Sequence, residues 1–570
     1  MIPRSEHPKP QFMRENWQNL NGQWQFEIDP TSIGDVFVFF EVGKKLSQEI
    51  TVPFCPESKL SGIHNVDFMD TVWYKRTVNI ENTENTVRLH FGAADYQTTV
   101  YVNGKKAGEH EGGFTSFYID INDYIVKGEN EICVRCDDDI RCHKHARGKQ
   151  CFGYKSAGCL YTRTTGIWQT VWLEFLPEKY VEWVKYYPNI NDGSVTVRAK
   201  LNGCGDFSFK ASYEGKVMGE YTCKNASGEI FFTVNLTEKH LWEVGNGRLY
   251  DVEIGFNKDK VTSYFGLRQV RLDGMKFLIN EKSVFQRLVL DQGYYPDGVY
   301  TAPSDADLIK DIELSMKAGF NGARLHEKVF EERFLYHADR LGYIVWGEFG
   351  DWGFDYTEPD AIHYVLPQWI EAVERDFNHP AIIGWCPLNE IWDLRNKIPF
   401  KNNVENIYLT TKALDSTRPC IDASGGFHVK TDVYDVHDYE QNAEVYRKNY
   451  EPFKTSDELW DRRVFLNPSY KGRQEYHGEA CFVSEYGGIA YQLTDGWGYG
   501  DGVDTPEKFY ELFKGVTEVI MQHPKLFGLC YTQLTDVEQE KNGIYKFDRS
   551  EKFDVAPIKE ILSQKAEIED

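Results

Sequence analysis

The sequence IIGWCPLNE, residues 382–390, decides how the C-terminal half of the chain is interpreted. It begins as an apolar run and ends in the polar pair Asn389 and Glu390. An apolar run without alternation is typical of a strand buried on both faces, as in a parallel sheet. CFVSEYGG, residues 481–488, has the same character and carries Glu485 near its end. Both segments therefore predict a parallel sheet whose strands end in carboxylates.

Similar runs alternate with amphipathic stretches from about residue 274 to residue 570. The predicted strands are VFQRLVLDQG (284–293), FNGARLHE (320–327), YIVWGEFG (343–350), IIGWCPLNE, CIDASGG (420–426), DVYDVHDY (432–439), CFVSEYGG and LFGLCYTQLTD (526–536). Between them lie helical stretches such as SDADLIKDIELSMKAG, with Ser304 as its N-cap, and DAIHYVLPQWIEAVERDFN. Eight strands alternating with helices over residues 274–570 predict a closed (β/α)8 barrel.

The first 273 residues carry strand patterns and no helical stretch of useful length. In residues 1–178, runs such as TVWYKRTVNI and IWQTVWLEFL are separated by turn signals such as Asn103-Gly104. This pattern predicts a β-sandwich. Residues 179–273 continue in strands whose turns have the spacing of an immunoglobulin-like sandwich. The sequence therefore predicts three domains.

Composition and charge restrict the partners that the chain can have. It has 570 residues, of which 41% are apolar, and a formal net charge of −24. A strongly acidic protein is a poor binder of nucleic acids and anionic membranes. The first residues lack the apolar run of a secretory signal, and no segment has the apolar length that spans a bilayer. We therefore expect a cytoplasmic protein that binds neither nucleic acid nor membrane.

The 12 cysteines are scattered along the chain, which fits a reduced compartment. CDDDIRCHKHARGKQC, residues 136–151, brings together Cys136, Cys142, His143, His145 and Cys151. A zinc site is the alternative to consider here, but the spacing matches no standard finger or ribbon. We expect neither a metal nor a cofactor.

Active sites of (β/α)8 barrels lie at the C-terminal ends of the strands. The polar residues that end the predicted strands are Asp291, Gln292, Arg324, His326, Glu348, Asn389, Glu390, Ser424, His437, Tyr439, Glu485, Gln533 and Asp536. Glu390 and Glu485 stand out because each ends a strongly apolar strand. A buried carboxylate is costly unless it is paired or functional.

Two such carboxylates suit the cleavage of a glycosidic bond. One carboxyl donates a proton to the departing oxygen, and the other attacks the anomeric carbon in its ionised form. Mutual repulsion separates the two pKa values, and a nearby cation such as Arg324 keeps the nucleophile ionised. If both glutamates act in this way, we expect their carboxyl groups about 5–5.5 Å apart. A structural ion pair is the alternative for either glutamate alone.

Motifs in both halves of the chain resemble glycoside hydrolase family 2, and the resemblance covers nearly the whole sequence. They are WQNLNGQWQF, VPFCPESKLSGI, VYVNGKKAGEHEGGFTSF, TTGIWQTVWLE, VLDQGYYPDG, FNGARLHE, GWCPLNE, VHDY, FVSEYGG and YTQLTDVEQEKNGIY. The resemblance implies a jelly-roll sugar-binding-like domain at residues 1–178, an immunoglobulin-like β-sandwich at 179–273 and a catalytic TIM barrel at 274–570. It also implies a retaining double displacement, with Glu390 as acid/base and Glu485 as nucleophile.

The resemblance further implies which residues contact the substrate. Asn389 corresponds to the residue that holds the sugar 2-hydroxyl, and Arg324 to the arginine that orients the nucleophile. The other residues expected to contact the sugar are His326, Asp291 (at the 4-hydroxyl), His437, Tyr439 and the candidate sugar platforms Trp352 and Trp497.

Within the family, the sequence favours an exo-acting enzyme on β-galactoside-type substrates, either small oligosaccharides or glycosides. Family members that cleave β-glucuronides carry an Asn-x-Lys motif after the last strand, whereas this chain has Asn542-Gly543-Ile544. Lys546 and Arg549 are the nearby cations that could serve a uronate instead. A β-galacturonidase or β-glucuronidase is therefore the first alternative, followed by a β-mannosidase or an α-L-arabinopyranosidase.

A protein of another class, a carbohydrate-binding protein without catalysis, is the alternative to an enzyme. Loss of catalysis in such a barrel would follow from loss of a carboxylate, and both Glu390 and Glu485 are present. The sequence leaves open whether the chain forms a homo-oligomer.

Overall fold

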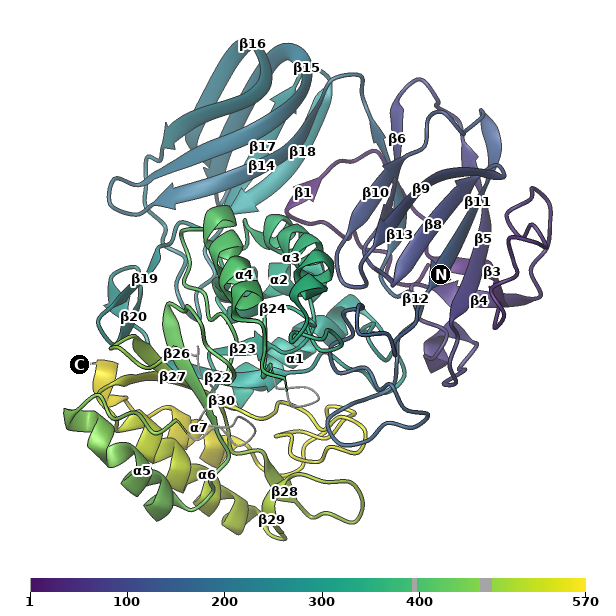
Figure 1. Ribbon diagram of the computed structural model, residues 1–570. Coiled ribbons are helices and arrows are strands. Elements are labelled where there is room, and N and C mark those ends of the chain that lie inside the picture. The colour runs from purple at the N-terminus through teal and green to yellow at the C-terminus, as the bar shows by residue number, and fades with distance from the viewer. Residues whose placement is uncertain (1, 392–396, 462–473, 570) are drawn as a thin grey trace.

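The computed structural model describes residues 2–391, 397–461 and 474–569. Figure 1 shows two β-domains side by side above a third domain in which strands alternate with helices. The predicted multidomain fold, with two β-sandwiches followed by a barrel, is confirmed.

The first β-domain is a sandwich of two antiparallel sheets. The strands of its larger sheet, in spatial order, are β4 (Gln48–Val52), β3 (Gly22–Ile28), β5 (Thr71–Ile80), β11 (Gly128–Asp137), β8 (Gln97–Val102) and β9 (Lys105–Glu111). Those of the smaller sheet are β10 (Phe117–Asp120), β6 (Thr86–Phe91), β13 (Val171–Leu176) and β2 (Trp17–Asn19). Alternate residues of both sheets, such as Val72, Leu89 and Val134, are fully buried between them. Two short strands, β7 (Ala94–Asp95) and β12 (Gly166–Ile167), pair separately.

The second β-domain is built around two long strands, β15 (Ser194–Tyr213) and β16 (Lys216–Asn235). The first half of β15 pairs with β14 (Tyr180–Asn189) and its second half pairs with β17 (Tyr250–Phe256). β18 (Asp259–Phe265) continues the sheet and pairs with β1 (Phe12–Met13). The N-terminal strand thus belongs to the second sheet, a long-range pairing that the sequence pattern did not predict.

A small sheet of β19 (Val270–Asp273), β20 (Lys276–Ile279) and β21 (Lys282–Ser283) precedes the barrel. The parallel barrel strands are, in spatial order, β25 (Ile382–Cys386), β24 (Ile344–Glu348), β23 (Gly322–Leu325), β22 (Gln286–Asp291), β30 (Leu526–Tyr531), β27 (Ala480–Tyr486) and β26 (Val433–Asp438). The surrounding helices are α1 (Asp305–Lys317), α2 (Glu332–Leu341), α3 (Ile362–Asp376), α4 (Lys401–Leu414), α5 (Ala443–Thr455), α6 (Pro506–Met521) and α7 (Ala556–Leu562). β28 (Ile489–Tyr491) and β29 (Tyr499–Val503) form a ribbon beside it.

The predicted fifth barrel strand, CIDASGG, is present only as two isolated parallel bridges, Trp385 with Cys420 and Asn389 with Ser424. Its small residues and Gly425, which has a φ of +58°, do not support a regular strand. The segment still closes the gap beside β25, because Glu390 N donates to Ser424 O at 2.9 Å. The irregular strand thereby fixes the backbone of Glu390.

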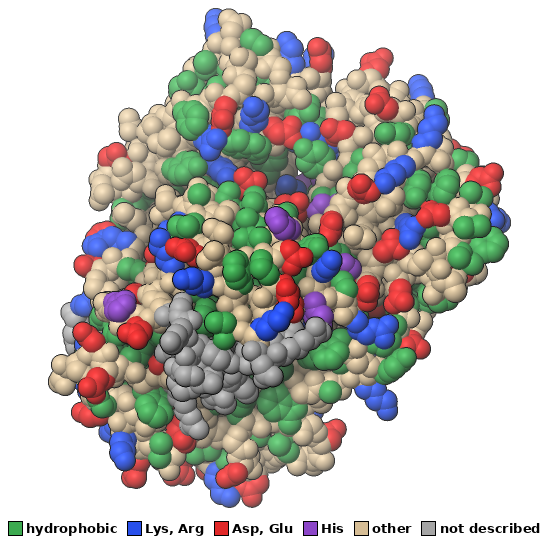
Figure 2. Space-filling model, in the orientation of Figure 1, with side chains coloured by type: hydrophobic (Ala, Val, Ile, Leu, Met, Phe, Trp, Pro, Cys, Tyr) green, Lys and Arg blue, Asp and Glu red, His purple; other side chains and the backbone are tan. Residues whose placement is uncertain are grey.

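The predicted N-terminus of α1 is confirmed, with Ser304 at the N-cap. Its hydroxyl, however, donates to the carboxylate of Asp307 at 2.6 Å instead of accepting a backbone N–H. On the face in Figure 2, acidic and basic side chains are interspersed over the molecule. Among the described residues, no helix has the length and apolar character needed to cross a membrane.

Candidate active site

Glu390 and Glu485 lie together at the C-terminal end of the barrel strands. Glu485 belongs to β27, and Glu390 follows β25 in a left-handed conformation with a φ of 44°. A glutamate seldom adopts this conformation, so its surroundings must hold it there. One carboxylate oxygen of Glu390 lies within 4.8 Å of one of Glu485. Such a close approach is typical of retaining pairs, whereas inverting pairs are about 6.5–9.5 Å apart.

His437, in β26, joins the two glutamates. Its Nδ1 is 2.6 Å from Glu390 Oε1 and 3.3 Å from Glu485 Oε2, and its Nε2 is 3.1 Å from Ser424 Oγ. Burial lowers the pKa of His437, but Glu485 and Glu390 outweigh this effect, so its pKa lies above the ordinary value. The imidazole therefore favours a proton on the edge that faces both carboxylates.

Arg324, in β23, is fully buried and makes the predicted contact with Glu485. Its Nη1 donates to Glu485 Oε1 at 3.2 Å and to Ser484 O at 3.0 Å, while its Nε donates to Glu348 Oε1 at 2.5 Å. Charge-assisted bonds of this kind favour ionised carboxylates and fix their orientation. Arg324 therefore holds the Glu485 carboxylate in place and favours its anionic form.

Asn389 has a donor available for a ligand. Its Oδ1 accepts from Arg324 Nη2 at 3.0 Å, and its backbone N donates to Asp351 Oδ1 at 2.8 Å. Its Nδ2 is buried and has no hydrogen-bond partner within residues 2–391, 397–461 and 474–569. Because buried donors are normally paired, this N–H is suited to a ligand or water. The arrangement agrees with the predicted contact to a sugar hydroxyl.

Tyr439, which follows β26, and His326, which follows β23, both approach Glu485. Tyr439 OH donates to Glu485 Oε2 at 2.5 Å, and its ring stacks on Tyr499 with the centroids 3.7 Å apart. His326 Nδ1 is 3.2 Å from Glu348 Oε2, and its Nε2 is 3.8 Å from Glu485 Oε1. Together with Arg324, these side chains surround the Glu485 carboxylate with potential donors.

A cavity of about 310 Å³ opens over the two carboxylates. Its lining residues are Lys149, Gly158, Cys159, Leu290, His326, Trp352, Glu390, Tyr439, Glu485, Trp497, Tyr499, Thr532 and Glu540. Both predicted tryptophan platforms are among them. Trp352 Nε1 donates to Asn389 O at 3.0 Å and Trp497 Nε1 donates to Gly158 O at 2.6 Å, so both rings are fixed. The volume is at the lower end of the range for ligand pockets, about 300–1,000 Å³, and suits one sugar unit.

Asp291 does not join this site, so its predicted contact with the 4-hydroxyl is not supported. The preceding residue, Leu290, lines the cavity, and successive side chains of a strand point to opposite faces. The Asp291 carboxylate instead accepts from Gly293 N at 2.9 Å. Burial and the nearby Asp311 raise its pKa to about 7.

Lys149, Tyr499 and Glu540 line the cavity although they were not among the predicted site residues. Glu348 was recognised as a strand-end carboxylate, but its pairing with Arg324 was not predicted. Lys149 lies in residues 138–165, the loop between β11 and β12 of the first β-domain. The cysteines and histidines of this loop suggested a zinc site as an alternative, whereas Lys149 is the residue of the loop that lines the cavity in the barrel.

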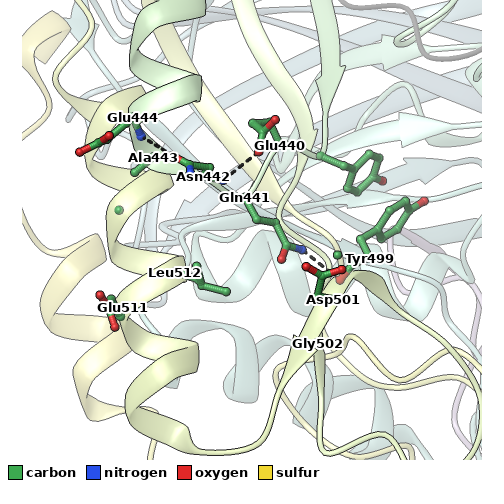
Figure 3. Close-up of a pocket in the computed structure, with 13 residues that line it drawn as sticks. Glu440, Gln441, Asn442, Ala443, Glu444, Tyr499, Asp501, Gly502, Glu511 and Leu512 are labelled. Carbon is green, nitrogen blue, oxygen red and sulfur yellow. Dashed lines mark hydrogen bonds between the residues drawn. The ribbon is translucent and has the colours of Figure 1, made fainter.

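A larger cavity of about 830 Å³ lies beside the site (Figure 3). Its lining residues include Tyr439 and Tyr499 as well as the acidic side chains Glu440, Glu444 and Asp501. Neither Glu390 nor Glu485 is among its lining residues. The stacked tyrosines thus separate this acidic hollow from the paired carboxylates.

Potential metal ligands come together at one place in the described part of the chain. This group of Glu390, His437 and Glu485 has its ligand atoms within 4.8 Å of one another. The 2.6 Å distance between His437 Nδ1 and Glu390 Oε1 is that of a direct hydrogen bond. Residues 136–151, all of which are described, form no such group: the His145 ring stacks on Tyr96 with centroids 3.8 Å apart, and its Nδ1 is 3.9 Å from Asp138 Oδ1.

The sequence matches two descriptions of one family. Residues 17–143 match the sugar binding domain of glycosyl hydrolases family 2, and residues 270–488 match the TIM barrel domain of that family. Together with the fold and the paired glutamates, these matches place the chain in glycoside hydrolase family 2.

Curated relatives in the family include glucuronidases and galactosidases. A putative beta-glucuronidase of Formosa agariphila is 27% identical over 56% of this chain and 40% of its own length. The beta-glucuronidase of Mus musculus is 26% identical over 62% of this chain and 59% of its own length. A beta-galactosidase of Thermoanaerobacterium thermosulfurigenes is 28% identical over 56% of this chain and 47% of its own length. The chain therefore spans about half the length of these relatives.

Solved structures support the fold. The beta-glucuronidase of Ruminococcus gnavus in complex with D-glucuronic acid has a TM-score of 0.78 at 19% identity, covering 99% of this chain and 100% of that chain. A beta-glucuronidase from an uncultured Clostridium has a TM-score of 0.76 at 21% identity, covering 96% and 98%. The arrangement of all three domains is thus shared with these proteins.

Proposed function

We propose that the chain is a retaining exo-β-glycosidase in which Glu390 is the acid/base and Glu485 is the nucleophile. The observation that carries this proposal is the position of His437 Nδ1, 2.6 Å from one carboxylate and 3.3 Å from the other. Two carboxylates that share one imidazole edge repel each other, and a fold keeps such repulsion mainly at functional sites. The short separation leaves room for a covalent intermediate and not for an interposed water.

In the proposed first step, Glu485 attacks the anomeric carbon of the substrate from the α face. The new ester bond forms as the glycosidic C–O bond breaks, and Glu390 gives its proton to the departing oxygen. Arg324 and Tyr439 orient the attacking carboxylate through their bonds to Oε1 and Oε2. The unpaired Nδ2 of Asn389 is placed to donate to the sugar 2-hydroxyl.

In the second step, Glu390 is a carboxylate and acts as the general base. It takes a proton from a water molecule, the water attacks the anomeric carbon from the β face, and Glu485 leaves as a carboxylate. Two inversions give net retention. His437, with its raised pKa, keeps a proton next to Glu390 while that carboxyl changes its charge.

The proposed glycone is a β-linked uronic acid of the glucuronide type. The names of the curated relatives support it, and so do the solved structures with the same fold, whereas the sequence motifs alone favoured a galactoside. A β-galactoside is the second candidate, because the relatives also include beta-galactosidases. Exo-action is supported by the size of the cavity, about 310 Å³, which suits a single terminal sugar.

A panel of nitrophenyl glycosides tests this function: the β-glucuronide, β-galacturonide, β-galactoside, β-mannoside and α-L-arabinopyranoside. We expect the highest kcat/KM for the β-glucuronide and, by NMR during turnover, a first-formed product that is the β-anomer. A first-formed α-anomer would show inversion and contradict the double displacement. If the protein binds sugars and cleaves none of the panel, it belongs to the carbohydrate-binding class instead.

Removal of metal ions is expected to leave activity intact. The mechanism uses a hydrogen-bonded His437 between the carboxylates, and no step needs a Lewis acid. After exhaustive dialysis against EDTA, we expect kcat/KM to stay within about 2-fold of its starting value, whereas true metal hydrolases lose their nucleophile. Loss of turnover that one divalent cation restores would show that Glu390, His437 and Glu485 hold a metal.

A further inference from the structure

We propose that Lys149, from the first β-domain, binds the sugar carboxylate and thereby sets the preference for an acidic glycone. This inference rests on the proposed function and names the residue that would recognise its substrate. Lys149 belongs to residues 138–165, a loop that leaves the first β-domain after β11 and reaches the rim of the barrel (Figure 1). There it lines the same cavity as Glu390 and Glu485.

The backbone on either side of Lys149 is fixed against the barrel. Arg147 N donates to Trp352 O at 2.8 Å and Gly148 N donates to Gly350 O at 3.1 Å. Gly148 has a φ of +54°, and a Cβ there would lie 2.1 Å from the carbonyl oxygen of Glu327, so only glycine fits. The lysine side chain is therefore delivered to the cavity by a rigid support and not by a loose loop.

The other end of the loop closes over the cavity as well. Tyr161 OH donates to Glu540 Oε2 at 2.5 Å, and Tyr161 N donates to Lys149 O at 2.8 Å. Gly158 O accepts from Trp497 Nε1 at 2.6 Å. The first β-domain thus supplies one wall of the sugar cavity, and Lys149 is the charged side chain on that wall.

The Lys149 side chain is largely buried, and its ammonium group lies over the rings of Trp352 and Tyr161. The residue is 6% exposed, and Nζ lies 5.6 Å from the ring centroid of Trp352. Within the described residues, Nζ makes no hydrogen bond and has no carboxylate within the 4.0 Å of an ion pair. A largely buried cation that has aromatic contacts but no hydrogen bond or ion pair is favourably completed by a bound anion.

Lys149 is expected to be charged in the free protein. Burial lowers its pKa, but Glu540, followed by Cys159, Glu485 and Glu390, raises it more, and the resulting pKa lies above the ordinary value. Glu540 has its own donors in Tyr161 OH and Asn542 Nδ2, the latter at 2.9 Å. Three carboxylates would repel an anionic sugar, so its binding requires a cation inside the cavity.

Of the other cations nearby, Arg147 lines a neighbouring cavity together with Glu390, and its Nε is buried without a hydrogen-bond partner among the described residues, whereas Arg324 and Arg549 are already engaged. Arg324 bonds to Glu348 and Glu485, as described above. After β30, Arg549 pairs with Asp311 at 2.9 Å, so it does not serve a uronate as the sequence had allowed, and Lys546 is exposed. Lys149 is the one lysine or arginine among the described residues that line the cavity.

The test compares two substrates that differ only at carbon 6, nitrophenyl β-D-glucuronide and nitrophenyl β-D-glucoside. Lys149→Met keeps most of the length of the side chain and removes its charge. We expect kcat/KM for the glucuronide to fall by about 100-fold or more, as when one partner of a buried charge pair is removed. The glucoside rate should change by less than about 3-fold, the range of an uninvolved site. Lys149→Arg should recover part of the glucuronide rate.

Lys155→Met is the matched control, because Lys155 is an exposed lysine on the same loop. This substitution should leave kcat/KM for both substrates unchanged. Calorimetric binding of free D-glucuronate to the wild type and to Lys149→Met gives a measurement that does not need turnover, and we expect binding to weaken by a similar factor.

Equal losses on both substrates, or unchanged glucuronate binding in Lys149→Met, would overturn the inference, because the lysine would then serve the loop or a shared hydroxyl. The proposed function would stand in that case if the wild type still cleaves the glucuronide with retention. A wild type that prefers neutral glycosides would overturn both the uronate substrate and the role of Lys149, yet leave the double displacement intact. Absence of any glycoside cleavage would overturn the proposed function itself.

Discussion

Glu485→Ala is expected to abolish glycosyl-enzyme formation with every substrate. The attacking oxygen is absent in this variant, and Arg324 and Tyr439 then orient nothing toward the anomeric carbon. Deletion of a covalent nucleophile commonly lowers kcat by a factor on the order of 10⁴–10⁶. We expect a loss of this size whether the leaving group is good or poor, measured as the initial rate of nitrophenol release.

Glu444→Ala is a matched control for this variant. Glu444 is an exposed carboxylate that lines the neighbouring acidic cavity (Figure 3), which neither of the paired glutamates lines. Removal of the Glu444 carboxylate should leave kcat/KM within about 2-fold of the wild-type value, the usual effect of a surface substitution. If Glu485→Ala retained a tenth or more of the wild-type rate in a correctly folded protein, Glu485 would not be the nucleophile.

Glu390→Ala is expected to have an effect that depends on the leaving group. A dinitrophenyl glycoside needs little protonation, so its first step should survive while the second step, which lacks a base, becomes slow. A burst of dinitrophenol followed by a slow steady state should therefore appear, with the covalent intermediate visible by mass spectrometry. For substrates with poor leaving groups we expect losses of about 10²–10⁴-fold, the contribution of general acid catalysis.

Glu390→Gln keeps the shape of the side chain and its position next to His437, and serves as the control for packing. It should show the same dependence on the leaving group as the alanine variant. Equal losses on activated and unactivated substrates would show that Glu390 supports the structure of the site and does not transfer the proton.

The fold could be predicted from the sequence wherever one segment carried its own pattern. The apolar runs that lead to Glu390 and Glu485 predict buried strands from their own residues alone. The N-cap at Ser304 is likewise a signal within the local sequence. The fifth barrel strand was predicted as regular, but CIDASGG forms only bridges, because its small residues and glycines do not hold an extended ladder.

The site could be predicted only in part, because part of it is made by contacts between distant segments. Strand-end residues such as Arg324 and His437 meet Glu485 because parallel strands end at one rim. The same rule predicted that Asp291 lies at this site. Side chains alternate along β22, however, so Leu290 faces the cavity and Asp291 does not. The rule for strand ends cannot predict Lys149, because this residue belongs to the first β-domain. Only the docking of loop 138–165 against the barrel brings Lys149 to the cavity.

The loop from the first β-domain gives that domain a role in the chemistry of the barrel. We expect a cut or insertion within residues 138–165 to remove one wall of the cavity, because Lys149, Gly158 and Cys159 line it, while both glutamates remain in place. We therefore expect the two effects to be separable: in the proposed mechanism the barrel supplies the residues that break the glycosidic bond, and the first β-domain supplies Lys149 to distinguish sugars.

The assignment of the two glutamates is tested most directly by the configuration of the glycosyl azides that their alanine variants form. Azide needs no base, so in Glu390→Ala it attacks the covalent intermediate from the β face, and the product should be the β-glycosyl azide. In Glu485→Ala, azide takes the place of the missing carboxylate on the α face, and any product should be the α-glycosyl azide. An α-azide from Glu390→Ala together with a β-azide from Glu485→Ala would show that the roles of the two residues are reversed.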